Sequence, residues 1–262
     1  MIFQAVTAGL YCTMYVLLFG AISQAGLVAF DFLFRKQRRP KGNETAGLMF
    51  GAISLIYSLI LAFVIVAVWT DYEDLTETIG KETYKLNEVM THSSTLPDSI
   101  RHPLDKALKD YCTNVVTQEW ELGEGEVSSF PVTITRMRML LMHIQPGDKL
   151  QESVAAVILE DLNRISDLRR ERLEHIRSHV PQVVWLILKA GSLILIVFSY
   201  FLEVPWIHMK RVYLFFLSSI MGMSLFLVDV LNDPFQGSVA VSKRPYEITL
   251  EKLQQPSFLP KN

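Results

Sequence analysis

Four long apolar stretches constrain this chain more than any other feature, and a charged stretch separates the second from the third. The apolar stretches span residues 5–34, 46–69, 182–201 and 212–231. Each reaches the roughly 20 residues that a helix needs to cross about 30 Å of hydrocarbon. The composition agrees, because 50% of the residues are hydrophobic and only 20% are charged. We therefore expect an all-α integral membrane protein in which four transmembrane helices form two hairpins that flank a helical extramembrane domain.

The same pattern predicts how the chain is divided. We expect a first transmembrane hairpin over residues 1–70, a helical water-exposed domain over 71–180, a second transmembrane hairpin over 181–231 and a C-terminal tail over 232–262. Near-heptad apolar spacing after residue 71 predicts that the second membrane helix continues into water to about residue 93. An amphipathic helix with Pro103 in its first turn, a shorter helix over 133–144 and a long helix before Pro181 should follow.

The basic residues of the short loops bear on orientation. Residues 35–41 and 208–211 form short basic loops, and such loops usually stay in the cytoplasm. This places the 71–180 domain outside. The long helix before Pro181, however, carries Arg164, Arg169, Arg170 and further arginines close to the membrane, which favours the opposite orientation. The multi-pass topology predicts a plasma (inner) membrane protein in either case.

Several function classes lack support in the sequence. The net charge is −2, with no domain-wide basic stripe, so nucleic acid is not an expected partner. Hydrolase elbows, phosphate loops, dinucleotide fingerprints and paired-cysteine zinc motifs are absent, so we expect neither an enzyme nor a cofactor. Glu171, His175 and His179 have a spacing that can chelate a divalent ion, but Arg172 and Arg177 lie among them and no fourth ligand is evident. A solvated helix face is the preferred interpretation, and no metal is expected.

Lys189 is the most unusual residue, because it falls inside the third apolar stretch. An ammonium group there costs about 3 kcal/mol on insertion scales unless it finds a partner or water. If the third and fourth apolar helices form an antiparallel hairpin, Lys189 lies level with Leu225 and about one turn, or ~6 Å, from Asp229. One hypothesis is that Lys189 and Asp229 face a hydrated pore, and the alternative is a structural ion pair or a lysine that reaches the nearer interface.

Small residues recur at four-residue spacing in the apolar stretches. Such stripes allow helix backbones to approach closely in lipid, where hydrophobicity no longer drives association. Bundling within the chain and contacts between subunits both remain open explanations. The stripes are Gly47 with Gly51, Ser54 with Ser58 and Ala62, Ala21 with Ala25, and Ser218 with Gly222.

Several short patterns are spread over nearly the whole chain. They are Asn43-Glu44 before two glycines, an aromatic pair that closes the second apolar stretch, the pair Glu119-Trp120, and Asp233-Pro234-Phe235-Gly237 after the last stretch. Together these residues resemble the bestrophin-like domain family of bacterial membrane proteins. The positions that we take as the family motif are Glu44, Gly47, Gly51, Tyr57, Trp69, Glu119, Trp120, Asp233, Pro234 and Phe235.

The resemblance implies a distant relation to bestrophins, which are pentameric anion channels with four membrane helices per subunit. It therefore implies a homo-oligomer in contact with membrane lipids that conducts small ions, with anions as the first candidate. The alternative is a non-transporting membrane scaffold or sensor that binds a partner through the 71–180 domain. For the pair Glu119-Trp120 we expect a packing role, in which Glu119 meets an arginine of the 164–177 helix and Trp120 docks against neighbouring helices.

Overall fold

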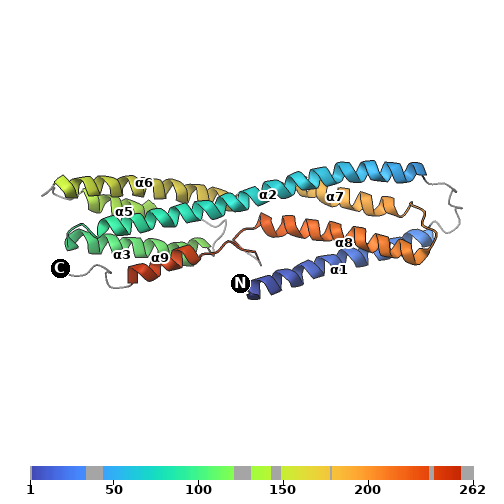
Figure 1. Cartoon of the computed structure of the whole chain (residues 1–262), viewed down its shortest axis with the longest axis horizontal. Coiled ribbons are helices and arrows are strands. Elements are labelled where there is room, and N and C mark those ends of the chain that lie inside the picture. Colours follow the sequence, from blue (N-terminus) through green and yellow to red (C-terminus); the bar gives the residue numbers. More distant parts are fainter. Residues whose placement is uncertain are drawn as a thin grey trace. The chain divides into compact units, whose positions relative to one another are not determined.

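The computed structural model describes residues 2–33, 44–120, 131–142, 149–177, 179–235 and 239–254, all of them helical or in connecting turns (Figure 1). Four features of the sequence lie outside these residues: the basic loop at 35–41, the break at 123–131 except for Pro131, the turn at 145–148, and Gly237. The helices are α1 (Ile2–Leu33), α2 (Glu44–Ser93), α3 (Asp98–Asn114), the π-helix η1 (Val115–Glu119), α5 (Pro131–Met142), α6 (Lys149–Arg177), α7 (Gln182–Ser199), α8 (Ile207–Asn232) and α9 (Arg244–Gln254).

The chain forms two compact units. One contains Met1–Thr70 and His179–Ala240, and the other contains Asp71–Ser178 and Val241–Asn262. The helix α2 is continuous over 50 residues and contributes to both units, as the apolar spacing after residue 71 predicted.

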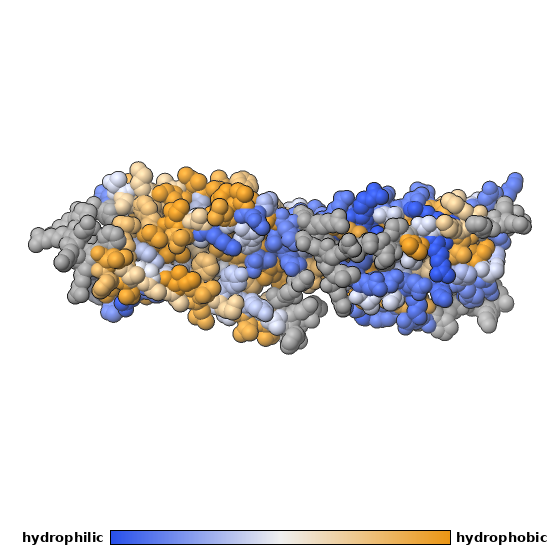
Figure 2. Space-filling model, turned by 180° about the vertical axis from the view of Figure 1, so that it is seen from behind, coloured by the Kyte–Doolittle hydropathy of each residue, from blue (hydrophilic) through white to orange (hydrophobic). Residues whose placement is uncertain are grey.

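The first unit contains the four apolar helices α1, α2, α7 and α8, each long and apolar enough to cross a membrane. Hydrophobic residues cover its surface (Figure 2). Such a surface is stable in lipid and would be a liability in water. The protein is therefore an all-α integral membrane protein, as predicted. The shared core of α2, α7 and α8 consists of Tyr57, Leu61, Leu188, Leu195, Met221, Leu225 and Val228.

Small residues let α1 and α8 cross closely. The Oγ of Ser23 on α1 donates to the Oγ of Ser218 on α8 at 3.0 Å, and both side chains are buried. A Cβ placed on Gly222 would lie 3.1 Å from the carbonyl oxygen of Tyr15 and 3.2 Å from Phe19. The predicted bundling role of the stripe Ser218 with Gly222 is thus confirmed.

The second unit packs amphipathic helices around the extension of α2. Its core draws on α2, α3, α5 and α6, with the C-terminal α9 in contact with α3 and η1. Pro103 lies inside α3, which begins at Asp98, so the expectation that Pro103 occupies the first turn was wrong. Proline lacks the N–H that the second turn would use, so α3 has one backbone hydrogen bond fewer at this point. The neighbouring Leu104 and Leu108 are buried. The buried apolar residues include Leu75, Ile79, Leu86, Val89, Leu104, Leu108, Ile134, Met137, Leu141, Ile158, Leu162, Ile165 and Leu168.

Candidate functional site

Lys189 lies on the outside of the four-helix unit. Its position is seven residues after the start of α7, or about 10 Å along the helix. The side chain is exposed, and its Nζ lies 4.9 Å from the centroid of the Trp185 ring. No acidic side chain in the described part of the chain lies within ion-pair distance of it. A cation–π contact to a tryptophan offsets part of the cost of an ammonium in hydrocarbon, but it does not neutralise the charge.

Asp229 has a different partner. Its Oδ2 accepts a hydrogen bond of 2.8 Å from the hydroxyl of Tyr15, which α1 supplies, and the carboxylate is exposed on the surface of the unit. The structure describes no ion pair between Asp229 and Lys189, so it does not bring the two candidates together within one chain. Their role in a pore stays a prediction.

The face of α2 that carries small residues is exposed along the membrane. A Cβ at Gly47 or Gly51 would have nothing within 4 Å, and Ser58 and Ala62 are also exposed. The hydroxyl of Ser58 donates to the carbonyl of Leu55 at 2.8 Å, so it is satisfied within the helix. Within the residues that the structure describes, no atom would lie against a Cβ at either glycine, in contrast to Gly222 on α8.

Tyr57 lies on the opposite, buried side of α2. Its hydroxyl donates to the backbone carbonyl of Leu188 at 3.0 Å, and its ring lies against Gly191, where a Cβ would collide with the ring carbons. A glycine at this point therefore allows α7 to approach the tyrosine. This contact explains the motif position Tyr57 as a packing residue.

Two arginines and two glutamates form a buried network in the second unit. The Nε of Arg172 donates to Glu82 at 2.9 Å, and its Nη2 donates to Glu119 at 2.6 Å. Arg169 donates twice to the other carboxylate oxygen of Glu119, at 2.9 Å and 2.7 Å. The side chains of Arg172 and Glu82 are 0% exposed and that of Glu119 is 2% exposed. The expectation that Glu119 meets an arginine of the 164–177 helix is confirmed, with two arginines in place of one.

Two tyrosines complete this network. The hydroxyl of Tyr111 donates to Glu82 at 2.6 Å, and the guanidinium carbon of Arg172 lies 5.6 Å from the centroid of the Tyr246 ring. Burial first, and then the charge of Glu82, raises the pKa of Tyr111 well above its ordinary value. Burial alone would lower the pKa of Arg172, but the charges of Glu82 and Glu119 outweigh it and raise this pKa. Both groups therefore stay protonated at every physiological pH.

A π-helical turn positions Glu119 and Trp120. The N–H of Trp120 donates to the carbonyl of Val115, five residues earlier. An α-helix would rotate the fifth residue about 140° away from the first, whereas the wider π turn returns it toward the same face. Val115 and Trp120 are consequently both buried, and the Trp120 ring meets Tyr246 edge-on at 6.0 Å.

The remaining motif positions lie at helix ends. Glu44 begins α2, Trp69 is 48% exposed near the end of its apolar part, and Asp233 follows the last residue of α8. The Oδ1 of that last residue, Asn232, accepts a 2.7 Å hydrogen bond from the N–H of Val180. Pro234 then prevents further helix, and Phe235 is 6% exposed.

Among the residues that the structure describes, no three His, Cys, Asp or Glu side chains lie close enough together to hold a metal ion. Glu171, the first residue of the spacing considered above, accepts a hydrogen bond of 3.2 Å from the hydroxyl of Thr78.

These features define an α-helical multi-pass membrane protein with a helical extramembrane unit whose helices are joined by buried ion pairs. The chain belongs to the Bestrophin-like domain family, whose sequence profile matches residues 17–246. No curated protein sequence matches it.

Solved structures share the fold at low sequence identity. A variant of a bacterial Bestrophin homolog from Klebsiella pneumoniae superposes with a TM-score of 0.71 at 13% identity, over 93% of this chain and 99% of that one. A second variant of the homolog gives a TM-score of 0.70 at 14% identity, over 93% and 97% of the two chains. A crystal structure described as that of a membrane protein gives 0.69 at 13% identity, over 93% and 97%. The recognised family and the all-α membrane fold are thus confirmed.

Proposed function

We propose that this protein is a homo-oligomeric ion channel of the plasma (inner) membrane, with anions as its preferred substrate. The observation that carries the proposal is the exposed position of Lys189 on the apolar unit, without an acidic partner among the described residues. A lysine that faces lipid at this depth costs about 3 kcal/mol on insertion scales, and a hydrated path removes that cost.

Four helices of a single chain are too few to enclose an ion-conducting path. The exposed small-residue face of α2, which includes Gly47, Gly51, Ser58 and Ala62, supports contact with further copies. Small residues allow close helix packing in lipid, and their backbone carbonyls and hydroxyls can also line a polar path. We place α2 and α7 of each subunit around that path, because α2 carries this face and α7 carries Lys189.

The charge of Lys189 supports the choice of anions. A ring of ammonium groups, one from each subunit, lowers the energy of an anion in a pore and raises that of a cation. Bestrophins, to which the family is distantly related, are anion channels, and that relation supports the same class here. Function does not follow from fold alone, so conduction needs a direct measurement.

The test is conduction by the purified protein in planar bilayers under a salt gradient. The wild type should reverse near the chloride equilibrium potential. Lys189→Gln should move the reversal potential toward zero, whereas Lys189→Arg should keep it. Lys106→Gln, which removes an exposed lysine on α3, is the matched control and should leave it unchanged.

Light scattering in detergent supplies the second measurement, because the proposal requires an oligomer. A monomer, or an oligomer that conducts under no voltage or salt condition, would reject the channel. It would favour the alternative of a membrane scaffold or sensor that acts through the helices of residues 71–180.

A further inference from the structure

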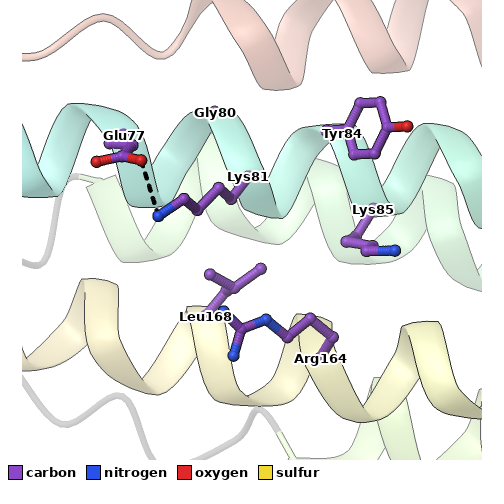
Figure 3. A pocket seen from close by; sticks show the side chains of 7 residues that line it. All are labelled: Glu77, Gly80, Lys81, Tyr84, Lys85, Arg164 and Leu168. Atoms are coloured by element: carbon purple, nitrogen blue, oxygen red, sulfur yellow. Dashed lines mark ion pairs between the residues drawn. The ribbon is translucent and has the colours of Figure 1, made fainter.

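A groove lies between α2 and α6 in the second unit. It has a volume of about 470 Å³ and is lined by Glu77, Gly80, Lys81, Tyr84, Lys85, Arg164 and Leu168. Figure 3 shows Lys81 and Lys85 on α2 and, facing them, Arg164 and Leu168 on α6. This volume falls within the range of about 300–1,000 Å³ that is typical of small-molecule sites.

Gly80 on α2 and Leu168 on α6 both line the groove, and Leu168 is buried. A Cβ at Gly80 would have no atom within 4 Å, so the missing side chain leaves open space at that point of the groove. Glycine inside a helix is unfavourable relative to alanine, and no positive φ or close backbone approach at Gly80 requires it. The space that it leaves is its one visible effect on the structure.

The rim of the groove carries three basic side chains, Lys81, Lys85 and Arg164, and one carboxylate, Glu77. Lys81 pairs with Glu77 at 2.9 Å in an exposed contact, and Lys85 is held by Glu88 and by Asp161. Hydrogen bonds to Glu88 and Asp161 raise the pKa of Lys85, so its ammonium stays charged. Arg164 is exposed and, within the described part of the chain, has no acidic partner. The guanidinium of Arg164 is therefore the rim cation that is available to a ligand.

We infer that this groove binds a small organic anion, in which a carboxylate or phosphate is attached to an apolar body. The anionic group pairs with Arg164, whose fork of N–H donors matches such oxygens. Lys81 adds a second contact, because its exposed pair with Glu77 is weak and exchanges readily. The apolar body lies over Gly80 and Leu168, beside the exposed ring of Tyr84. This inference does not rest on the proposed function, because occupancy of the groove can be measured whether or not the protein conducts.

Isothermal titration calorimetry of the full-length protein in detergent tests the inference with 2-naphthoate as the probe. The wild type should bind 2-naphthoate saturably and should not bind the neutral isostere 2-naphthamide. Octanoate, titrated in the same way, distinguishes a flexible acyl chain from a flat ring as the preferred body, and tighter binding of either one is compatible with the site.

Two variants assign the binding to the groove. Gly80→Leu adds a side chain to the open space, where its Cβ would have no atom within 4 Å, so it should abolish binding while the melting temperature is retained. Arg164→Gln should weaken binding about tenfold, the effect of losing one charge-assisted hydrogen bond. Arg170→Gln, an exposed arginine six residues further along α6, is the matched control and should bind as the wild type does.

Three results would overturn the inference: no saturable binding by the wild type, equal binding of 2-naphthamide, or binding that survives both Gly80→Leu and Arg164→Gln. If Gly80→Leu fails to fold, Arg164→Gln and its control still decide the matter.

Discussion

Replacing Arg172 by methionine should open the second unit more than any exposed substitution on the same helix. Arg172 is the centre of the buried network, since it binds Glu82 and Glu119 with a side chain that is 0% exposed. Glu119 keeps Arg169 after the replacement, whereas Glu82 loses its arginine and keeps the hydrogen bond from the hydroxyl of Tyr111. The variant thus leaves one carboxylate buried without a counter-charge.

The magnitude follows from that unpaired charge. Removing one partner of a buried ion pair costs about 3–5 kcal/mol, because the remaining charge loses its compensation while it stays desolvated. At about 1.4 kcal/mol per factor of ten, the opening equilibrium of the unit should rise by roughly a hundredfold to three thousandfold. Neutralising the stranded carboxylate as well, in Arg172→Met with Glu82→Gln, should recover part of this loss, because glutamine still accepts the bond from Tyr111. The expected recovery is about 1–3 kcal/mol.

Amide hydrogen exchange in detergent measures these openings peptide by peptide in α3 and α6. Arg170→Met, at an exposed site on α6, serves as the control and should change protection by less than about 0.5 kcal/mol. The reasoning fails if Arg172→Met stays within tenfold of the wild type, or if the double variant is no better protected than the single one. Either result would mean that water or rearrangement relieves the charge of Glu82.

Three further predictions address other parts of the chain. Gly51→Leu should alter the oligomer size by light scattering with little change in melting temperature, whereas Gly222→Leu should lower the melting temperature, since its side chain would collide with α1. Burial raises the pKa of Cys112 to about 12, so iodoacetamide should label it far more slowly than an exposed cysteine. The free energy of unfolding should also fall as the pH rises above 9.0, the ordinary pKa of the thiol, because only the thiol of the unfolded chain ionises there. The orientation can be tested with Asp98→Cys in a chain whose Cys12 and Cys112 are replaced by alanine. This cysteine should react with an impermeant maleimide on intact cells if the 71–180 domain lies outside, and only after lysis if that domain lies inside.

The transmembrane helices could be predicted from the sequence because their apolar runs are long and continuous. The predicted spans end within a few residues of α1, α7 and α8, and the extension of α2 to Ser93 followed from its heptad-like spacing. The partner of Glu119 could be predicted because a carboxylate at the end of an amphipathic helix faced an arginine-rich helix in the same domain. These signals depend on local periodicity and on charge, both of which a single sequence carries.

The buried network around Glu82 could not be predicted, because carboxylates on amphipathic helices usually indicate a solvated face. Burial of Glu82 depends on Tyr246 and α9, an 11-residue helix in what was expected to be a tail. One signal was available for the π turn: the apolar stripe of α3 steps by five residues from Val115 to Trp120, and an α-helix cannot keep that step on one face. The partner of Asp229 was also missed, since the hydroxyl of Tyr15 comes from the first helix and not from the neighbouring one.

The buried ionic network of the second unit and the lysine of the apolar unit differ in what determines their energy. Glu82, Glu119, Arg169 and Arg172 balance one another, two negative against two positive, so their energy is settled inside the unit and their replacement should mainly change folding. Lys189 has no such balance among the residues that the structure describes, so its energy depends on what lies beside the apolar surface that carries it. Replacing Lys189 should therefore leave folding largely intact and change whatever contacts that surface. If Lys189→Gln instead lowered the stability of the apolar helices as strongly as Arg172→Met lowers that of the second unit, the lysine would be a structural residue and the case for a charged conduction path would be lost.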